Sequence, residues 1–475
     1  MKHVVVVGGG LAGHAAALRA LELGQQVTLL EQGRDPLYPC NSRITGGVMH
    51  VAYQDVTLDP AVLFEALAQG TFGQAIPELG RMLSQGALRA VDWLEANGAV
   101  FAQIELTPGV YNTHALSPPG AQTTHAQSGQ GPDLLLQAMD ARIVALGGEI
   151  RLGCRVVDLV REGEMVRGVR VALAENDHEQ QIDADAVVLA DGGFQGNREL
   201  VRRHIAPKPE GVVQRGAGTG SGITLQVCEA AGAELIHLDS FYGHLLSADA
   251  LHNDDLWPYP LLDLLANTGI LVDRHGRRFC DEGLGGVDSA NKLARRDDPY
   301  AVIICDAAVW EQGSSSRMPP PPNPHLETQG GAVFRADTIE ALAVAAGLPP
   351  AALMETVAAF NQASAQGGLE NLPVRRSPPR KTIYAGDNAP AGLVKAPFMA
   401  IPTVPGITFT MGGPRIDAHA RVLHRAGRPI PGLYAVGSAS AGFDGGEDVG
   451  YAGGLVKATV TGLAAAEHIA GGGPN

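Results

Sequence analysis

The segment MKHVVVVGGGLAGHAAALRALELGQQVTLLEQ, residues 1–32, predicts the fold of the first domain. Val4–Val7 is a short β-branched run typical of a buried strand. Gly8, Gly10 and Gly13 follow in a G-x-G-x-x-G pattern, and an alanine-rich helix and a second strand come next. That order, with an acidic residue about 20 positions beyond the glycines, is the fingerprint of a dinucleotide-binding βαβ unit.

Each of the three glycines, and the acidic residue Glu31, has a distinct role in the predicted site. Gly8 makes the tight turn, Gly10 lets the backbone approach a pyrophosphate, and Gly13 lets helix and strand pack closely. The helix N-terminus offers free N–H groups to phosphates, and Glu31 can accept hydrogen bonds from a ribose diol. We therefore predict an ADP-containing cofactor rather than a plain turn. The residues of this segment predicted to bind it are Gly8, Gly10, Leu11, Ala12, Gly13, Glu31 and Gln32.

Composition and charge narrow the class of protein. The chain has 475 residues, enough for two or three domains, and its 45% hydrophobic and 18% charged residues are ordinary for a globular protein. The net charge of −15 argues against nucleic acid or an anionic membrane surface as a partner. No apolar run is long enough to span a membrane, and the first strand begins too early for a signal peptide.

The five cysteines are scattered and include no C-x-x-C pair. We therefore expect no metal centre, no iron–sulfur cluster and no disulfide framework. A reducing, cytoplasmic location fits this use of cysteine.

Glycine-rich and small polar segments recur along the chain. The loop 33–47 carries Asn-Ser-Arg at 41–43 and paired glycines that would let backbone approach a flat ring, although a plain surface loop is equally compatible. The apolar run at 182–189 predicts a strand that ends in Ala-Asp-Gly-Gly. The run GAGTGSG at 216–222 is either a second phosphate loop or, as we favour, a turn packed on the cofactor.

The composition shifts at about residue 240, where tyrosine, tryptophan and histidine cluster. We interpret 240–382 as an inserted domain. Patterns at 149–159 and 165–173 predict the strands of a hairpin. The segment 312–331 is rich in serine, proline and glycine and predicts a loop, because consecutive prolines break helices.

The chain carries a series of short motifs in a fixed order. They are GGGLAG at 8–13, VVLADGGF at 187–194, GTGSG at 218–222, GILVDRHGRRFCDE at 269–282, TMGGPRID at 410–417, GLYAVGS at 432–438 and GYAGGL at 450–455. Together they resemble the flavoprotein family of succinate dehydrogenase and fumarate reductase, which includes 3-ketosteroid dehydrogenases and tricarballylate dehydrogenase. NSRIT at 41–45 and RFCDEG at 278–283 are most similar to the tricarballylate-dehydrogenase branch.

The resemblance implies an α/β fold with a discontinuous, Rossmann-like FAD-binding domain (1–239 and 383–475) and an inserted α+β capping domain (240–382). The flavin would lie between them. Succinate dehydrogenase attaches its flavin through a histidine, whereas Asn41-Ser42-Arg43 stands here, so we expect non-covalent FAD. Asp191 replaces a usual threonine and Ser438 a usual glutamate. The other residues predicted to bind FAD are Asn41, Ser42, Thr45, Gly46, Gly47, Val156, Ala190, Asp191, Gly192, Gly437, Ser438, Gly453, Gly454 and Leu455.

The catalytic positions of fumarate reductases are mostly absent. Gly286 stands where that group has its proton-donating arginine, Phe409 where it has a histidine, and Tyr451 where it has an arginine. The substrate-clamp region reads Leu-Leu-Asp-Leu-Leu at 261–265, and His244 alone matches a substrate-binding histidine. A dianion without arginine partners would be poorly bound, so we do not expect fumarate as the substrate.

Tyr451 instead resembles a tyrosine of ketosteroid dehydrogenases, whose hydroxyl and a backbone N–H polarise a ketone. A base then takes the α-proton while the β-hydrogen passes to the flavin as hydride. The family's basic tyrosine falls at Gly286, so the base is missing or relocated. Its candidates are Tyr242, His244, Asp288 and Tyr259, each with a structural alternative: core packing for the tyrosines, a buried hydrogen-bonded histidine, and a helix N-cap for the aspartate.

The sequence thus predicts an FAD-dependent dehydrogenase, a desaturase that forms a C=C bond conjugated to a carbonyl in a small ketone or carboxylic acid. An ene-reductase working in the reverse direction and a flavoprotein subunit of a larger redox assembly are the alternatives. No motif encodes the electron acceptor.

Overall fold

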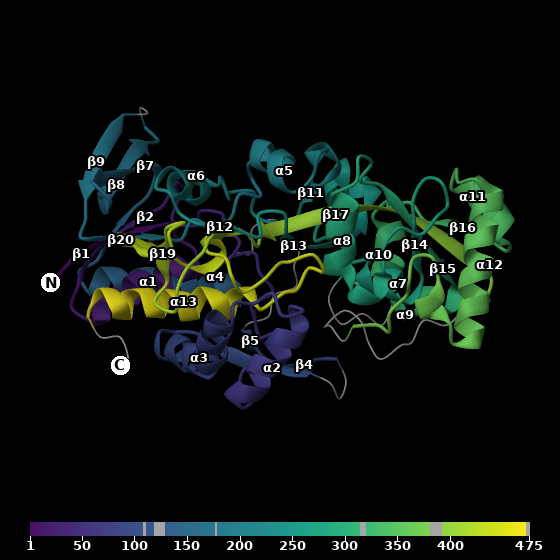
Figure 1. Ribbon diagram of the computed structural model, residues 1–475, viewed down its shortest axis with the longest axis horizontal. Coiled ribbons are helices and arrows are strands. Elements are labelled where there is room, and N and C mark those ends of the chain that lie inside the picture. The colour runs from purple at the N-terminus through teal and green to yellow at the C-terminus, as the bar shows by residue number, and fades with distance from the viewer. Residues whose placement is uncertain (108–110, 118–128, 176–177, 314–319, 381–391, 472–475) are drawn as a thin grey trace.

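The computed structural model describes residues 1–475 except 108–110, 118–128, 176–177, 314–319, 381–391 and 472–475 (Figure 1). The first strand and the last helix of the chain lie at one end of an elongated molecule, and the middle of the chain forms the other end (Figure 1). Two large sheets, one in each half, organise the structure.

The predicted βαβ unit forms the centre of the first sheet, which is a Rossmann-like sheet. β1 (His3–Val7) pairs in parallel with both β2 (Gln26–Leu30) and β10 (Ala186–Leu189). The helix α1 (Leu11–Glu22) connects β1 to β2. These strands are continuous apolar runs because both faces of a parallel sheet are covered. The strands, in spatial order, are β19 (Arg421–Leu423), β20 (Pro429–Ala435), β10 (Ala186–Leu189), β1 (His3–Val7), β2 (Gln26–Leu30) and β6 (Glu149–Arg151).

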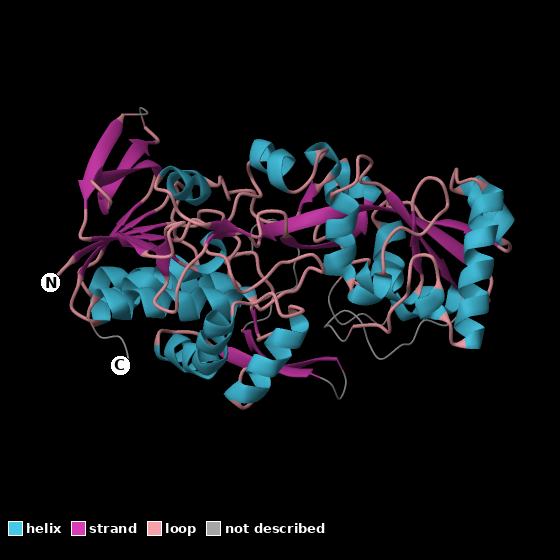
Figure 2. Ribbon diagram, viewed as in Figure 1, coloured by secondary structure: helices cyan, strands magenta, loops and turns pink. Residues whose placement is uncertain are grey.

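The end of the chain completes this first half of the molecule. β20 pairs in parallel with β10, and α13 (Gly454–Ile469) lies beside α1 on one face of the sheet (Figure 2). The opposite face carries a small sheet of three strands, β7, β8 and β9. The first half of the molecule is therefore built from two separate stretches of the chain. The other elements of this half are α2 (Pro60–Gly70), α3 (Pro77–Ala96), α4 (Gly131–Ala145), α6 (Ile223–Ala230), β3 (Val48–Met49), β4 (Phe101–Thr107), β5 (Tyr111–Leu116), β7 (Cys154–Glu162), β8 (Met165–Leu173), β9 (Glu179–Asp183), β12 (Leu235–Ile236) and β18 (Gly413–Pro414).

The second sheet is built around β17 (Phe398–Thr410), which runs through the middle of the molecule (Figure 1). It pairs with β13, β15 and β16 in antiparallel and with β11 in parallel orientation. The other strands are β11 (Val213–Gln214), β13 (Phe241–Ser247), β14 (Ile270–Val272), β15 (Ala301–Asp306) and β16 (Phe334–Ala336). The helices of this half are α5 (Arg198–His204), α7 (Asp263–Thr268), α8 (Gly286–Ala294), α9 (Ala307–Gly313), α10 (Pro322–Thr328), α11 (Ile339–Ala345) and α12 (Pro350–Gln366).

The domain limits at 239/240 and 382/383 stay a prediction. The second limit lies outside the described residues, and β17 beyond it pairs with strands of the predicted capping domain. No helix in the described ranges combines the length and the apolar composition that crossing a membrane requires.

Two predicted elements were wrong. Part of 312–331 forms α10, because Pro322 occupies the first helical turn, where a missing N–H costs nothing. The run 149–159 is not one strand: β6 joins the first sheet and β7 starts a separate hairpin, with Gly153 at φ +68° between them. Alternation alone does not reveal that a strand changes sheet.

Candidate active site

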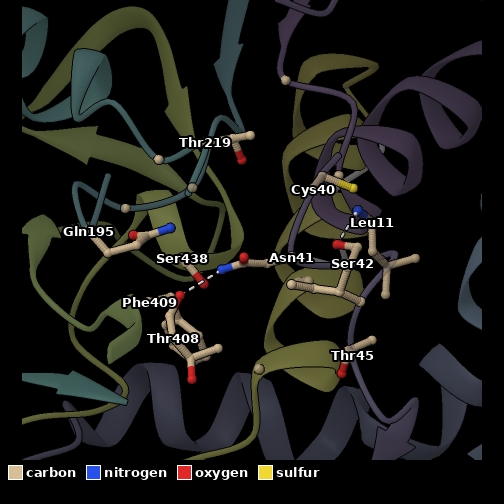
Figure 3. A pocket seen from close by; sticks show the side chains of 18 of the residues that line it. Leu11, Cys40, Asn41, Ser42, Thr45, Gln195, Thr219, Thr408, Phe409 and Ser438 are labelled. Carbon is tan, nitrogen blue, oxygen red and sulfur yellow. Dashed lines mark hydrogen bonds between the residues drawn. The ribbon is translucent and has the colours of Figure 1, made fainter. Parts of the chain in front are cut away.

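A cleft that is partly open to solvent runs between the two halves of the molecule. Figure 3 shows Leu11, Ser42 and Cys40 on one wall, and Gln195, Thr408 and Phe409 on the opposite wall. The predicted cofactor residues that line it are Gly8, Gly10, Leu11, Ala12, Glu31, Gln32, Asn41, Ser42, Thr45, Gly46, Val156, Ala190, Asp191, Gly192, Ser438, Gly454 and Leu455.

The glycines of the first motif form a cradle at one end of the cleft. Gly8 has a φ of +106°, and a Cβ there would lie 2.7 Å from the Ala190 carbonyl oxygen. Gly10 is the N-cap of α1 and lines the cleft, so the positive end of the helix dipole faces the cavity. A cofactor phosphate can approach this surface closely because Gly8 and Gly10 carry no side chains of their own.

Four predicted glycines lie behind the cleft wall, where they permit close packing. A Cβ at Gly13 would overlap the Gly8 carbonyl oxygen, and one at Gly453 would overlap the His50 carbonyl oxygen. A Cβ at Gly437 would lie 2.8 Å from that of Ala12. The fourth is Gly47, whose Cβ would lie 3.0 Å from Leu116 Cβ.

Hydrogen bonds hold Glu31 and the loop 33–47 in place. Glu31 accepts from the backbone N–H of Gly9 (2.8 Å) and of Gly33 (2.7 Å), which fixes its carboxylate at the cleft. Ser42 Oγ accepts from Leu11 N (2.9 Å), and Asn41 Nδ2 donates to the Thr408 carbonyl across the cleft (2.9 Å, Figure 3). The loop is therefore a wall of the site and not a plain surface loop.

Asp191, at the position of the family's usual threonine, also lines the cleft. Burial raises its pKa to about 6, and the Thr224 hydroxyl donates a hydrogen bond to its Oδ1. Thr219, Gly220 and Ser221 of the GAGTGSG segment line the same cleft, so that segment contacts the predicted cofactor space.

Aromatic rings form the part of the site between the two sheets. The Tyr242 and Tyr451 rings stack with centroids 4.1 Å apart, and Tyr242 and Phe409 stack at 5.2 Å. His50 stacks on Tyr53 at 5.2 Å, and Tyr53 meets the edge of Tyr451 at 5.8 Å. This aromatic box favours a flat or cyclic apolar group.

Tyr451 lies at the N-terminus of α13. Its hydroxyl oxygen accepts a hydrogen bond from the Gly454 N–H (2.8 Å), so the phenolic proton remains available to donate. Burial raises the pKa of Tyr451 well above its ordinary value, and Tyr242 nearby adds to the shift. Tyr451 is therefore a protonated hydrogen-bond donor and not a base.

His244 is completely buried on β13, and its Nδ1 lies 2.6 Å from Asp263 Oδ2. Burial lowers the pKa of His244, against the opposing effect of Asp263. Asp263 lines a small second cavity together with Tyr451, and a Cβ at Gly286 would overlap its carboxylate. The space above Gly286 is thus filled by an acid from α7.

The other candidate bases occupy different places. Asp288 is buried in the first turn of α8 and is not an N-cap, and it does not line either cavity. Burial raises its pKa to about 6. Tyr259 lines the main cleft, where its ring meets the edge of Trp257 at 5.2 Å.

The sequence motifs did not indicate four side chains that the structure places at the site: His50, Tyr53, Asp263 and Arg380. Burial lowers the pKa of His50 to about 4, so it is neutral. Asp263 is a single acid within an apolar run, which is a signal for a buried functional carboxylate. His50 and Tyr53 carry no such signal in the sequence.

The comparisons with known proteins agree with this geometry. Residues 3–450 match the model of a family described as "FAD binding domain". A "Fumarate reductase (cytochrome)" of Shewanella frigidimarina is 27% identical, covering 94% of this chain and 73% of that protein. A "4-oxocyclohex-2-ene-1-carboxylate 5-dehydrogenase" of Sinomonas cyclohexanicum is 29% identical, covering 65% and 55%. The 3-ketosteroid delta1-dehydrogenase structure from Sterolibacterium denitrificans has a TM-score of 0.74 at 20% identity, covering 99% and 100%.

The chain belongs to the FAD binding domain family. FAD is its cofactor, and the glycine cradle and cleft fit that group. The class of protein is an FAD-dependent oxidoreductase that acts on CH–CH groups, in the dehydrogenase or the ene-reductase direction.

Proposed function

We propose that this protein is a dehydrogenase that forms a C=C bond next to the carbonyl of a small, flat or cyclic substrate. The observation that carries the proposal is the Tyr451 hydroxyl within the aromatic box, which accepts from the Gly454 N–H (2.8 Å) and so keeps its own proton available to donate. A substrate carbonyl oxygen fits there because it can accept from the phenol, which the hydrogen bond from the Gly454 N–H makes a stronger donor. The negative charge that develops on this oxygen as the α-proton leaves is then stabilised.

The proton acceptor we propose is the Asp263–His244 pair. Asp263 reaches the cavity that Tyr451 lines, and it shares a hydrogen bond with the neutral imidazole of His244. The Asp263 carboxylate takes the α-proton and becomes a neutral carboxylic acid, while the hydrogen bond to His244 holds it in place. Bound FAD supplies the two-electron acceptor, to which the β-hydrogen passes as hydride. This assignment replaces Asp288, Tyr242 and Tyr259 as the leading candidates for the base.

A ketone is favoured over fumarate as the substrate. Phe409 and Tyr451 form aromatic walls at positions where fumarate reductases, by the resemblance, carry histidine and arginine. The name of the Sinomonas cyclohexanicum relative describes a ring ketone as its substrate, which supports the same choice. The Shewanella frigidimarina relative is named as a reductase, so an ene-reductase is the second candidate.

We also propose that FAD is held without a covalent bond, that a separate partner accepts the electrons, and that the protein works in a reducing, cytoplasmic compartment. Asn41 and Ser42 use their side chains for hydrogen bonds within the protein, which supports the non-covalent cofactor. All five cysteines are free thiols, which supports the reducing compartment.

The test is anaerobic absorbance of the protein-bound flavin during titration with saturated cyclic ketones and then with saturated di- and tricarboxylates. We expect a cyclic ketone to bleach the oxidised flavin. Bleaching only by di- or tricarboxylates would contradict the ketone assignment. Reoxidation of pre-reduced protein by enones, without any bleaching in the forward direction, would establish the ene-reductase instead.

A further inference from the structure

The irregular basic segment 369–380, which we call the strap, ends at the second cavity with Arg380. Asp281 fixes its centre, because its carboxylate accepts from both Ser377 N (2.8 Å) and Ser377 Oγ (2.6 Å). At its end, Arg380 N donates to the Gly283 carbonyl (2.8 Å). The strap is therefore hydrogen-bonded to the turn between β14 and α8 and has a defined course.

A buried charge cluster anchors the strap further. Arg376 is completely buried, donates to the Asn267 carbonyl, and lies 3.9 Å from the Glu282 carboxylate. Glu282 also forms an ion pair with Arg278. Burying such a cluster costs desolvation free energy, which its ion pairs and hydrogen bonds offset. Here the cluster fixes the part of the strap from which Arg380 extends.

Arg380 presents its guanidinium to the site. It lines the second cavity together with Tyr53, Asp263 and Tyr451. Its Nη2 donates to the Gly70 carbonyl (2.9 Å), and its guanidinium lies 3.9 Å from the centre of the Phe72 ring. These contacts orient the group but use few of its five N–H donors.

No carboxylate among the described residues lies within ion-pair distance of Arg380. Asp263 is engaged by His244 and by Leu245 N, and the charges of Asp288 and Asp448 act on Arg380 only from beyond that distance. Partly buried cations are normally paired, so an oriented guanidinium at a cavity, with no carboxylate partner in the described part of the chain, indicates an anionic ligand.

We propose that Arg380 binds a carboxylate of the substrate, which makes the substrate a small cyclic keto acid with one carboxylate. The placement of its carbonyl at Tyr451 rests on the proposed function; the carboxylate site does not. The aromatic box, whose Tyr451 lines both cavities, would hold the ring of the substrate. Arg215 also lines the cleft, but it lines the main part and donates to Thr408 Oγ1 (2.8 Å).

The test is calorimetric titration of the FAD-loaded protein with benzoate and with its neutral analogue benzamide. The variants are Arg380→Gln, Arg380→Lys and, as a matched control on the same strap, Arg375→Gln, whose side chain is 61% exposed. We expect Arg380→Gln to weaken benzoate binding about 10- to 100-fold, the usual range for a charge-assisted hydrogen bond, and to leave benzamide unchanged. Arg380→Lys should restore part of the affinity because it keeps a point charge.

Equal benzoate affinities in the unmodified protein and in Arg380→Gln would overturn the proposal, as would no benzoate binding at millimolar concentration. An equal loss for benzamide, or the same loss in Arg375→Gln, would also overturn it. Flavin content and melting temperature verify that each variant is folded. If benzoate binding depends on Arg380 while no ketone bleaches the flavin, the carboxylate site stands and the proposed function fails. If a ketone bleaches the flavin while benzoate binding does not depend on Arg380, the proposed function stands and the carboxylate site fails.

Discussion

At the scale of single residues, Gly10 separates cofactor binding from folding. Its φ of −79° is open to any residue, and a Cβ there would meet only Ser42 Oγ at 3.3 Å. We therefore expect Gly10→Val to fold but to lose FAD, because the added methyl groups enter the phosphate space. Flavin absorbance per chain should fall to near zero while the melting temperature matches that of the unmodified apoprotein. A yellow Gly10→Val protein would remove the phosphate-cradle assignment.

Tyr451 and Tyr242 allow a matched comparison, since their rings stack at 4.1 Å and both line the cleft. Tyr451→Phe removes one donor to the proposed carbonyl oxygen and should lower kcat about 100- to 1000-fold, the usual loss for one oxyanion donor. FAD content should not change. Tyr242→Phe should reduce kcat much less. If the two variants exchange these outcomes in turnover assays, Tyr242 and not Tyr451 polarises the substrate.

At the scale of elements, α8 carries a buried acid whose ionisation opposes folding. Burial raises the pKa of Asp288 from 3.8 to about 6. The folded state therefore holds a proton that the unfolded state loses between these values, so stability falls as pH rises through this window. Above it the deficit is about 3 kcal/mol. Asp288→Asn should melt higher than the unmodified protein at pH 7.5, and this difference should shrink toward pH 4.5.

The exposed Asp297, just beyond α8, is the control for this measurement. Asp297→Asn should show the same small difference at both pH values. A pH-independent effect of Asp288→Asn would mean that Asp288 is not ionised differently in the folded and unfolded chain.

A buried ion pair joins α13 to the loop that carries Tyr451. Lys457 Nζ lies 2.5 Å from Asp444 Oδ2, both side chains are 1% exposed, and Asp444 Oδ1 accepts from Ala452 N. Lys457→Met leaves the Asp444 charge buried and should cost about 3–5 kcal/mol. Adding Asp444→Asn should recover part of the melting temperature. The half-exposed pair of Lys292 and Asp448 is the control, where Lys292→Met should cost at most about 1 kcal/mol.

Local and long-range features differ in how far the sequence predicted them. β1, α1 and β2 were predictable because their glycines and apolar runs act within 30 residues. The Asp263–His244 pair was not, although the two residues are only 19 positions apart, because no sequence motif indicates that α7 begins beside β13. The same reason hid Arg380, which the strap brings beside Tyr451. Tyr451 itself was predicted as a candidate, although its hydrogen bond to Gly454 needs the geometry of α13.

At the scale of the whole molecule, the cleft is built from both halves. The Gly8 cradle and Ser42 come from the start of the chain, whereas Thr408 and Phe409 come from β17 of the second sheet. Asn41 bridges these walls through its hydrogen bond to the Thr408 carbonyl. A cofactor placed there contacts both halves and should stabilise their contact, so removal of FAD should lower the melting temperature of the whole chain.

Retention of FAD by contacts alone is the final prediction for the whole molecule. Cys40, Cys154 and His50 line the cleft and carry side chains that could attach a flavin. Burial raises the pKa of Cys40 to about 11, so its thiol is not a nucleophilic thiolate at neutral pH. Acid precipitation of the holoprotein should therefore leave all flavin absorbance in the supernatant. Flavin that pellets with the chain would show a covalent bond, and its loss in Cys40→Ala or in His50→Gln would identify the residue that forms it.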